Sequence, residues 1–268
     1  MKSDCLKMKR IVIKIGSNVL TRDDGSLDVT RISSLVDQVQ AILSDGAQVM
    51  IVTSGAVACG RSLLSRVGVA HHLDTVEQRQ LYSAVGQVQL IDLYSRLFKD
   101  WGTTIGQVLT MKKNFSTRRE YQNQRACMEV MLENNVVPVI NENDTVCVTE
   151  LMFTDNDELS GLVASMMNAD MLIILSNVDG IYDAPPSDKA SRVIEKVYPG
   201  DDISGSIGAQ KSGAGRGGMR SKYSIAAKAA EEGIHVFIAN GTREGILRDL
   251  YFGAPGTVCT EFVPSKKK

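Results

Sequence analysis

Six short apolar runs, rich in β-branched residues, recur along the chain and alternate with stretches that have helical character. Apolar runs of this length are typical of strands that are buried on both faces of a sheet. Strands that alternate with helices need crossover connections, so the pattern predicts an α/β fold, a three-layer α/β/α sandwich with a largely parallel central sheet. The predicted strands are 11–15, 49–52, 105–109, 136–140, 171–175 and 236–239.

Five stretches between or after these runs are predicted to be helices. In the first, residues 32–43, apolar side chains recur at helical spacing, and Gly46 is a favourable residue for the C-terminal stop. The other helices are predicted over 81–98 and 118–132, after Asn156 and after Gly218. Between Asp183 and Gly218 the composition changes to Pro, Ser, Gly and charge, which predicts a mobile, loop-rich excursion.

The residues that follow the predicted strands indicate where a ligand would bind. In parallel α/β sheets, ligands bind at the carboxyl ends of the strands. Five of the runs end in small, polar or glycine-rich segments, and this coincidence is more informative than any one of them. The segments are Gly16-Ser17-Asn18, Thr53-Ser54-Gly55-Ala56, Asn141-Glu142-Asn143-Asp144, Ser176-Asn177-Val178-Asp179-Gly180 and Asn240-Gly241.

The size and charge of the chain limit the classes of protein that it could belong to. Its 268 residues, 43% hydrophobic and 23% charged, suit an ordinary folded α/β domain. We expect a single domain, residues 1–268, whose two lobes cover about 1–175 and about 176–268. The formal net charge of −1 predicts no general attraction for nucleic acid or anionic lipid, so an anionic substrate must meet a local positive cluster.

The location of the protein is predicted from its N-terminus and its cysteines. The first residues, MKSDCLKMKRIVIKIG, lack the sustained apolar segment and cleavage site of a secretory signal. No apolar stretch approaches the roughly 20 residues that span a bilayer. The five cysteines are widely spaced and odd in number, unlike a zinc site or a redox dithiol. We therefore expect a cytoplasmic protein with reduced thiols and no membrane partner.

Lys14 lies inside the first apolar run, where an unpaired ammonium group would be costly to bury. One interpretation is that its aliphatic stem is buried while the charge reaches solvent at the strand end. The other is a cation held at the edge of the sheet to bind phosphate oxygens, with Gly16 allowing the backbone to approach. The second interpretation predicts a binding site for an anion.

The segment Gly213-Ala214-Gly215-Arg216-Gly217-Gly218-Met219-Arg220-Ser221-Lys222 is the most glycine-dense part of the chain. It formally matches the G-x-G-x-x-G pattern of dinucleotide sites, but no strand directly precedes it, so that match is weak. Free N–H groups of such a loop, followed by a helix N-terminus, suit a phosphate, and Lys222 would reach the transferred group. A flexible linker is the alternative, against which Arg216, Arg220 and Lys222 argue.

Two acidic segments are predicted at the same edge of the sheet. Thr154-Asp155-Asn156-Asp157 precedes a helix, so Asp155 or Asn156 could act simply as its N-cap. Turn formation alone is likewise an alternative for the segment 141–144. Several carboxylates at one edge would be costly without cations or magnesium nearby. The hydroxyl and N–H groups of residues 53–56 could receive an anion where a helix begins.

No histidine belongs to any of these groups: His71 and His72 are predicted at the surface and His235 at the start of a strand. This favours a reaction that needs no histidine base. A carboxylate acceptor is already ionised at neutral pH, so phosphoryl transfer to it needs only positioning and charge neutralisation. The P-loop and protein-kinase motifs are absent from the sequence, which excludes the two commonest ATP-binding designs.

Five segments, taken in order, resemble the glutamate 5-kinase family, whose fold is that of the amino acid kinases. They are 12–17, 52–56, 137–144, 155–157 and 217–222, which together extend over nearly the whole chain. The resemblance implies ATP-dependent formation of γ-glutamyl phosphate from L-glutamate, the first step of proline biosynthesis. It also implies ATP and Mg²⁺ as cofactors, with the metal carried mainly by ATP rather than by protein ligands.

The resemblance also implies roles for individual residues. Lys14 and Lys222 would neutralise the phosphoryl group, and Asp157 would orient both lysines as the third catalytic residue. The glutamate site would comprise Ser54, Gly55, Ala56, Asn141, Asp144, Asp155 and Asn156. The nucleotide site would comprise Lys14, Gly16, Ser176, Asn177, Arg216, Gly217, Gly218, Met219, Arg220, Ser221 and Lys222.

Three departures from the family pattern concern the nucleotide side and the length. The family often has Thr-Asp where Ser176-Asn177 stands and Thr where Arg216 stands, so details of nucleotide binding are expected to differ. Many members carry a C-terminal PUA domain, which we do not expect here. The resemblance further implies inhibition by proline, a homo-oligomer (dimer or tetramer), and functional coupling to glutamate-5-semialdehyde dehydrogenase.

Other functions remain open from the sequence alone. N-acetylglutamate, aspartate, carbamate and UMP are the acceptors of other enzymes with this fold, although Thr53-Ser54-Gly55-Ala56 favours glutamate over acetylglutamate and UMP. A nicotinamide-dependent oxidoreductase would depend only on the weak glycine match. A non-catalytic amino-acid sensor is the third alternative, and the presence of Lys14, Lys222 and Asp157 argues against it.

Overall fold

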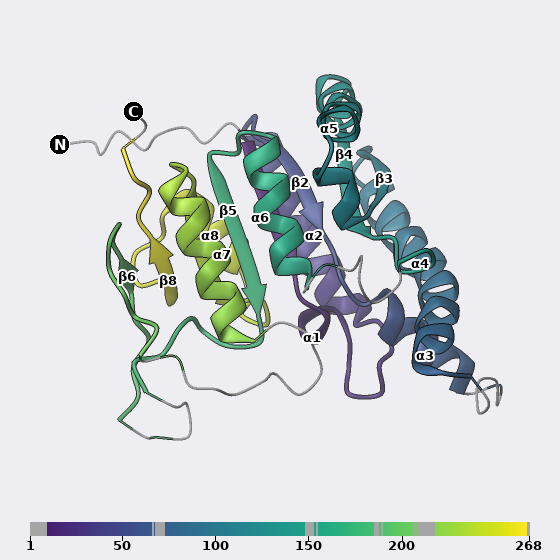
Figure 1. The fold of residues 1–268 in the computed structure, drawn as a ribbon, viewed down its shortest axis with the longest axis horizontal. Helices are drawn as coiled ribbons and strands as arrows, with labels where there is room; N and C mark the ends of the chain where they lie inside the picture. The colour runs from purple at the N-terminus through teal and green to yellow at the C-terminus, as the bar shows by residue number, and fades with distance from the viewer. Residues whose placement is uncertain are drawn as a thin grey trace.

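A computed structural model of the chain describes residues 10–65, 67, 73–147, 153, 155–184, 188, 190–205, 207 and 218–266. These residues form an eight-stranded sheet in the order β3-β4-β2-β1-β5-β7-β8-β6, with helices on both of its faces (Figure 1). All neighbouring strands are parallel except β7 and β8. The strands are β1 (Arg10–Ile15), β2 (Gln48–Val52), β3 (Thr104–Thr110), β4 (Val136–Glu142), β5 (Met171–Ser176), β6 (Lys196–Val197), β7 (His235–Asn240) and β8 (Cys259–Phe262).

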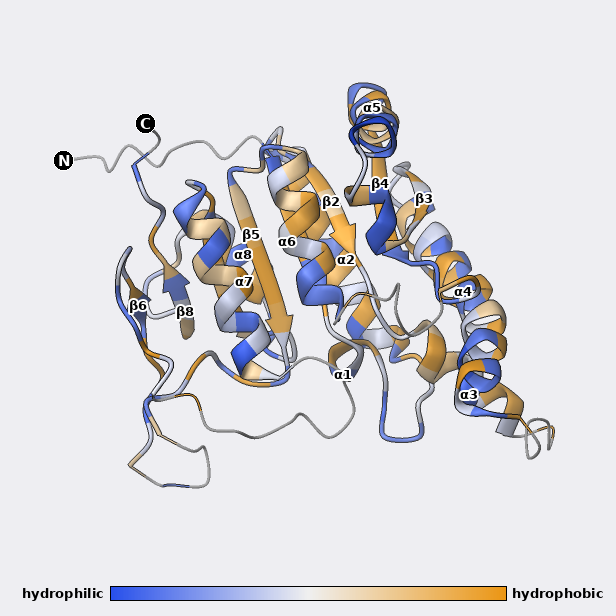
Figure 2. Cartoon of the chain, viewed as in Figure 1, coloured by the Kyte–Doolittle hydropathy of each residue, from blue (hydrophilic) through white to orange (hydrophobic). Residues whose placement is uncertain are grey.

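The helices form two layers, each with its own hydrophobic core against one face of the sheet. One core joins the sheet to α2, α4 and α8, and the other joins it to α5, α6 and α7. Strands β2 and β5, in the middle of the sheet, are hydrophobic along most of their length (Figure 2). The helices are α1 (Ser17–Leu20), α2 (Val29–Ser44), α3 (Ala56–Ser65), α4 (Thr75–Lys99), α5 (Arg118–Glu133), α6 (Asn156–Met166), α7 (Met219–Glu231) and α8 (Ile246–Phe252), with a 3-10 turn at Lys112–Phe115.

The direction of Lys14 follows from the alternation of side chains along β1. Ile13 and Ile15 point into the core on the α2 side, whereas Val12 points into the core on the α6 and α7 side. Because successive residues of a strand point to opposite faces, Lys14 shares the face of Val12. Its register partners are Val52 on β2 and Ile174 on β5, so the ends of these three strands lie side by side.

The predicted fold class and all six predicted strands are confirmed, but one prediction about burial is wrong. Strand β3 was expected to be buried on both faces, yet Thr104, Gln107 and Leu109 are exposed. The reason is its position at the edge of the sheet, where it pairs with β4 alone. Strands β6 and β8, helices α1 and α8 and the 3-10 turn were not predicted.

The helix predicted over 81–98 begins six residues earlier than expected, at Thr75. The Asp74 side chain accepts from the N–H groups of Val76 and Glu77, and the Glu77 side chain accepts from the Asp74 N–H group, which forms a capping box. A capping box satisfies N–H groups that a helix N-terminus otherwise leaves without a partner. It extends α4 over the edge of the sheet where the polar strand ends lie.

Helices α3 and α4 cross at very short range through two glycines. A Cβ atom on Gly60 would lie 1.8 Å from the Tyr82 carbonyl oxygen, and one on Gly86 would lie 1.9 Å from that of Ala56. Only a residue without a side chain permits backbones to approach this closely. The crossing holds the first residue of α3 against α4.

No helix in the described part of the chain is long and apolar enough to cross a membrane.

Candidate active site

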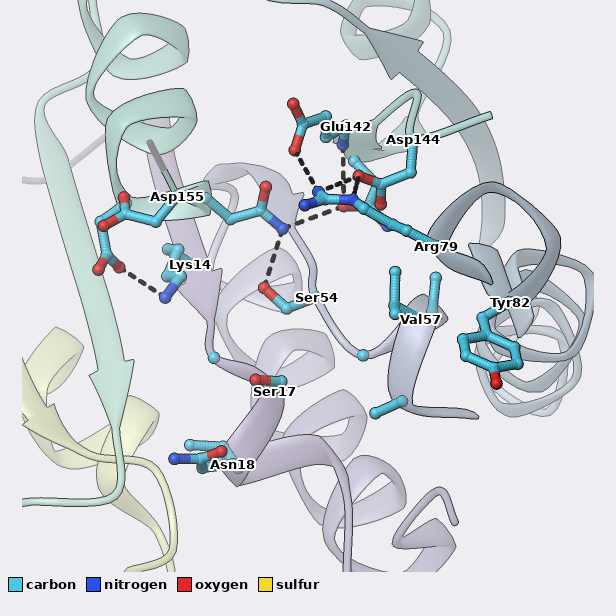
Figure 3. A pocket seen from close by; sticks show the side chains of 18 of the residues that line it. Lys14, Ser17, Asn18, Ser54, Val57, Arg79, Tyr82, Glu142, Asp144 and Asp155 are labelled. Carbon is cyan, nitrogen blue, oxygen red and sulfur yellow. Dashed lines mark hydrogen bonds and ion pairs between the residues drawn. The ribbon is translucent and has the colours of Figure 1, made fainter. Parts of the chain in front are cut away.

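The carboxyl ends of β1, β2, β4 and β5 open into a cavity of about 420 Å³, at the edge where the sequence predicts a ligand (Figure 3). Thirteen of the predicted site residues line it, and they come from segments spread over most of the chain. They are Lys14, Gly16, Ser54, Gly55, Ala56, Asn141, Asp144, Asp155, Asn156, Asp157, Ser176, Asn177 and Lys222.

The remaining predicted site residues lie outside the lining of this cavity. Gly218 is the N-cap of α7. Met219 is the first residue of that helix and packs against the core on the α6 and α7 side of the sheet. Arg220 and Ser221 lie in the first turn of α7. Arg216 and Gly217 lie outside the described residues, as does Thr154.

Asp157, in the first turn of α6, contacts both of the predicted catalytic lysines. Its Oδ1 atom lies 2.5 Å from Lys14 Nζ, and its Oδ2 atom accepts a hydrogen bond of 2.8 Å from Lys222 Nζ. All three side chains are buried. Burial by itself would raise the pKa of Asp157, but Lys14 and Lys222 together hold it below its usual range. The carboxylate therefore remains ionised, and the three groups carry one net positive charge.

The beginnings of α6 and α7 are tied together by Asp155. Its side chain accepts from the N–H group of Glu158, at 2.9 Å, and from the hydroxyl group of Ser221, at 2.6 Å. The first contact is an N-cap, the alternative role that the sequence offered for this residue. The second aligns α7 with α6, so that Lys222 approaches Asp157.

Asn156 connects the carboxyl ends of two neighbouring strands, β2 and β4. Its Nδ2 atom lies 2.7 Å from the Thr53 carbonyl oxygen, 2.9 Å from Ser54 Oγ and 3.0 Å from Asn141 Oδ1. Asn141 in turn donates to Gln87 Oε1, at 2.8 Å, from α4. These amide and hydroxyl groups form a polar wall between the lysine pair and α4.

Arg79, on α4, lies opposite this wall and was not predicted from the sequence. Its Nε atom donates to Asp144 Oδ1 at 2.9 Å, and its Nη2 atom contacts Asp144 Oδ1 and Glu142 Oε2, the latter at 3.1 Å. Figure 3 shows Arg79 extending from the α4 side of the cavity to both carboxyl groups. Ser83, one turn further along α4, donates to Asp144 Oδ2 at 3.4 Å.

The two carboxyl groups of this cluster are almost fully buried, with relative exposures of 4% for Glu142 and 5% for Asp144. Burial and the neighbouring Asp144 carboxylate raise the pKa of Glu142 to about 7. Burial also raises the pKa of Asp144, against the lowering effect of Arg79. Two adjacent carboxylates cannot both ionise readily, so the pair of Glu142 and Asp144 keeps a proton to a higher pH than an isolated carboxyl group would.

Two glycines allow the backbone to take the conformation that it has at the edge of the cavity. Gly55 has a φ of 96°, a conformation that residues with a side chain rarely adopt. Gly16 donates its N–H group to the Leu175 carbonyl oxygen at 3.2 Å, which closes the gap between the ends of β1 and β5. Both glycines were predicted as site residues, and both line the cavity.

On the β5 and β7 side, Asp179 forms a second polar cluster. Arg243 donates to both of its oxygens, at 2.8 and 2.7 Å, and Asn240 Nδ2 donates to Oδ1 at 2.9 Å. These contacts hold the pKa of Asp179 below its usual range, mainly through Arg243. The cluster fixes the loop that begins with Ser176 and Asn177.

The donor set of the cavity suits a phosphate group better than a directly bound metal ion. The two buried ammonium groups of Lys14 and Lys222 face one carboxylate, so an added anion would be stabilised there. Within the described ranges, no group of three or more His, Cys, Asp or Glu side chains could hold a metal ion.

His235 lies at the start of β7, as predicted, and its ring contacts Glu261 at 2.7 Å.

Residues 9–240 match the amino acid kinase family, and the chain belongs to that family. It is 59% identical over 256 residues to glutamate 5-kinase from Bacteroides thetaiotaomicron, an alignment that covers 96% of this chain and 70% of the relative. It is 47% identical over 261 residues to glutamate 5-kinase from Chlorobaculum tepidum, with 97% of this chain and 70% of the relative covered.

Solved structures support the fold assignment. Carbamate kinase from Giardia lamblia, bound to AMP-PNP, aligns with a TM-score of 0.69 at 16% identity, covering 96% of this chain and 99% of that one. UMP kinase from Bacillus anthracis aligns with a TM-score of 0.64 at 18% identity, covering 96% of each chain. At such identities the likeness concerns the fold alone, because one fold supports many acceptors.

Proposed function

We propose that this chain transfers the γ-phosphoryl group of ATP to the γ-carboxylate of L-glutamate and forms γ-glutamyl 5-phosphate, the first step of proline biosynthesis. The observation that carries the proposal is the contact of Lys14 and Lys222 with one carboxylate, Asp157, in the lining of the cavity. The identity of 59% to a glutamate 5-kinase supports glutamate as the acceptor.

The reaction follows from the charges in the site. An oxygen of the ionised γ-carboxylate attacks the γ-phosphorus, the bond from that phosphorus to the bridging oxygen breaks, and ADP leaves with the bond electrons. Since the acceptor is already ionised, no side chain has to remove a proton. Lys14 and Lys222 stabilise the charge on the transferring oxygens, and Asp157 holds their ammonium groups in position. Magnesium, bound with ATP, would neutralise further phosphate charge.

The two substrates would approach from opposite sides of the lysine pair. We assign glutamate to the side formed by Ser54, Asn141, Asp144 and Asn156, within about 1–175, because polar side chains from β2, β4 and α6 meet there. We assign ATP to the side of Ser176, Asn177 and the N-terminus of α7, within about 176–268. A helix N-terminus favours phosphate.

Trapping of the acyl phosphate tests the proposal. The protein is incubated with MgATP, L-glutamate and hydroxylamine, and we expect γ-glutamyl hydroxamate that depends on both ATP and glutamate. Parallel reactions contain N-acetylglutamate, aspartate, carbamate or UMP. Release of ADP with one of these acceptors, and no hydroxamate from glutamate, would overturn the substrate while leaving the kinase activity in place.

Several wider properties extend this proposal. Inhibition by proline, assembly into a dimer or tetramer, a cytoplasmic location and coupling to glutamate-5-semialdehyde dehydrogenase follow from the family resemblance. Light scattering and a proline titration of the hydroxamate assay would test assembly and inhibition directly.

A further inference from the structure

Besides Arg61 and Asp155, the lining of the cavity contains two clusters of paired charges, and only one of these clusters belongs to the phosphoryl-transfer chemistry proposed above. At the first, Lys14 and Lys222 share Asp157 and leave one net positive charge. At the second, Arg79 lies between Glu142 and Asp144. The mechanism uses the first cluster and gives Arg79 no role.

The protonation of Glu142 decides the net charge of the second cluster. With its pKa raised to about 7 by burial and by Asp144, Glu142 is largely protonated below neutral pH. What remains is one ion pair, Arg79 with Asp144, whose net charge is zero. The cavity therefore offers one end with a net positive charge and another with two opposite charges side by side.

Arg79 also has a donor group that no hydrogen bond within the described part of the chain uses. Its Nε and Nη2 atoms bind the two carboxyl groups, whereas its Nη1 atom donates to none of the residues that the structure describes. The side chain lines the cavity and keeps 19% of its surface exposed. A guanidinium group presents its donors in a rigid plane, so Nη1 is held in place by the bonds of the other two nitrogens.

Resting on the proposed function, we propose that Arg79 determines specificity by binding the α-carboxylate of the amino-acid acceptor through Nη1, beside Asp144, which receives the α-ammonium group. The acceptor head group is a zwitterion, and it meets an ion pair of opposite arrangement, so each of its two charges faces a group of opposite charge. Its γ-carboxylate then lies toward Lys14 and Lys222. Glu142 acts as a positioning residue, since it holds Arg79 Nη2 at 3.1 Å.

A cycle of one variant and one substrate analogue tests this assignment. Wild type and Arg79→Met are each assayed with L-glutamate and with L-isoglutamine, which keeps the α-ammonium and γ-carboxylate groups but has a neutral α-amide. We expect kcat/KM to fall about 100-fold when either Arg79 is replaced or glutamate is replaced by isoglutamine. The variant acting on isoglutamine should lose little more than this, because both changes remove the same contact. If turnover of isoglutamine is undetectable, its affinity for each protein is measured instead, as the inhibition constant against glutamate.

The alternative outcomes separate this inference from the proposed function. If Arg79 only supports the fold, its replacement lowers the values for glutamate and isoglutamine by the same factor, which overturns the assignment. If wild type forms no hydroxamate from glutamate, the proposed function fails instead. Arg96→Met, on the same helix, is the matched control, because the Arg96 side chain is 67% exposed and forms an ion pair with the likewise exposed Asp92, outside the cavity.

Arg79→Met leaves two buried carboxyl groups without their cation, which destabilises the fold, so a second variant is needed. Arg79→Lys keeps the positive charge but has no planar pair of donors. It is expected to fold, as judged by circular dichroism, and to show the same loss of discrimination between glutamate and isoglutamine. Full discrimination by a folded Arg79→Lys protein would also overturn the assignment.

Discussion

The ammonium group of Lys14 lies 2.5 Å from the Oδ1 atom of Asp157, and both side chains are almost completely excluded from solvent. The ammonium group of Lys222 lies 2.8 Å from Oδ2, the other oxygen of the same carboxylate. One buried carboxylate thus sets the separation of two cations that come from β1 and α7. Because the three groups carry a single net positive charge, the site is stabilised further when an anion enters, which is the electrostatic condition for phosphoryl transfer.

Replacement of Lys222 by alanine should impair catalysis far more than it impairs binding of glutamate. Lys222 is expected to act on the charge that develops during transfer, so its loss should lower kcat by roughly 10²- to 10³-fold. The KM for glutamate should change much less, because Ser54, Asn141 and Asn156 remain. Steady-state kinetics of the hydroxamate assay measure both values.

Lys228→Ala is the matched control for this change, because Lys228 is an exposed lysine of the same helix. It should leave kcat and KM unchanged. An unaltered kcat in Lys222→Ala would remove Lys222 from the catalytic role.

Replacement of Asp157 by asparagine should destabilise the protein at neutral pH. The change leaves two buried ammonium groups without a counter-charge, which costs about 3–5 kcal/mol when one partner of a buried ion pair is removed. The pKa of Asp157 is lowered on folding, so its stabilising contribution is present above the pKa of the unfolded carboxyl group. That contribution is lost as the pH falls through the folded value.

Urea unfolding of wild type and Asp157→Asn between pH 7 and pH 3 measures this contribution. The two free energies of unfolding should differ most at pH 7 and converge in acid. Asp92→Asn, at a side chain that is 55% exposed, should follow wild type throughout. A constant difference across the whole pH range would contradict the assigned ionisation of Asp157.

Replacement of Glu142 by glutamine should stabilise the protein in mild alkali. The pKa of Glu142 is raised from 4.5 to about 7, so the folded chain holds a proton that the unfolded chain has already lost. The free energy of unfolding of wild type therefore falls as the pH rises from about 4.5 to 7, by at most about 3 kcal/mol. Glutamine cannot ionise, and Glu142→Gln should lack this decrease.

The other groups around Glu142 do not mask the effect. Cys147, whose pKa is raised to about 11 by burial and by the nearby carboxylates, stays neutral in this range. Burial also raises the pKa of Asp144, so this residue contributes to the pH dependence of both wild type and Glu142→Gln. Denaturation at pH 5 and pH 8 compares wild type, Glu142→Gln and the exposed control Glu133→Gln. Equal slopes in wild type and Glu142→Gln would contradict the prediction.

The place of the site could be predicted from the sequence because parallel strands end at a common edge. Lys14, Ser54, Asn141 and Ser176 belong to or directly follow four different apolar runs, and all of them line the cavity. Their convergence needs no knowledge of side-chain packing, only the topology of the sheet. The alternating runs fix that topology through their crossover connections.

Arg79 could not be predicted in this way, because nothing in its local sequence sets it apart from Arg96 on the same helix. Only the path of α4 over the strand ends brings the first arginine to Glu142 and leaves the second in solvent. The capping box at Asp74 and Glu77 was a readable signal for the true start of that helix. Strand β8 (Cys259–Phe262) was missed because it has only four residues and because one of its two buried positions is the polar Thr260, so its sequence has no apolar alternation.

The crossing of α3 and α4 provides the last prediction, because it holds both walls of the proposed glutamate side. Gly86 lies against the Ala56 carbonyl oxygen at the start of α3, and Arg79 lies two turns earlier on α4. A methyl group on Gly86 would meet that oxygen at 1.9 Å, which no side-chain rotation relieves. Gly86→Ala should therefore push the helices apart and destabilise the protein by about 1–3 kcal/mol or more.

The same displacement should weaken glutamate binding, because Ser54 and Ala56 move with α3 while Arg79 moves with α4. We expect the KM for glutamate to rise in Gly86→Ala, with a smaller change in the KM for ATP, whose proposed site lies beside β5 and α7. Thermal denaturation and the hydroxamate assay measure the two effects. Gly205→Ala is the control, since a Cβ atom there would meet nothing within 4 Å. A Gly86→Ala protein as stable as this control would show that the helices can separate without cost.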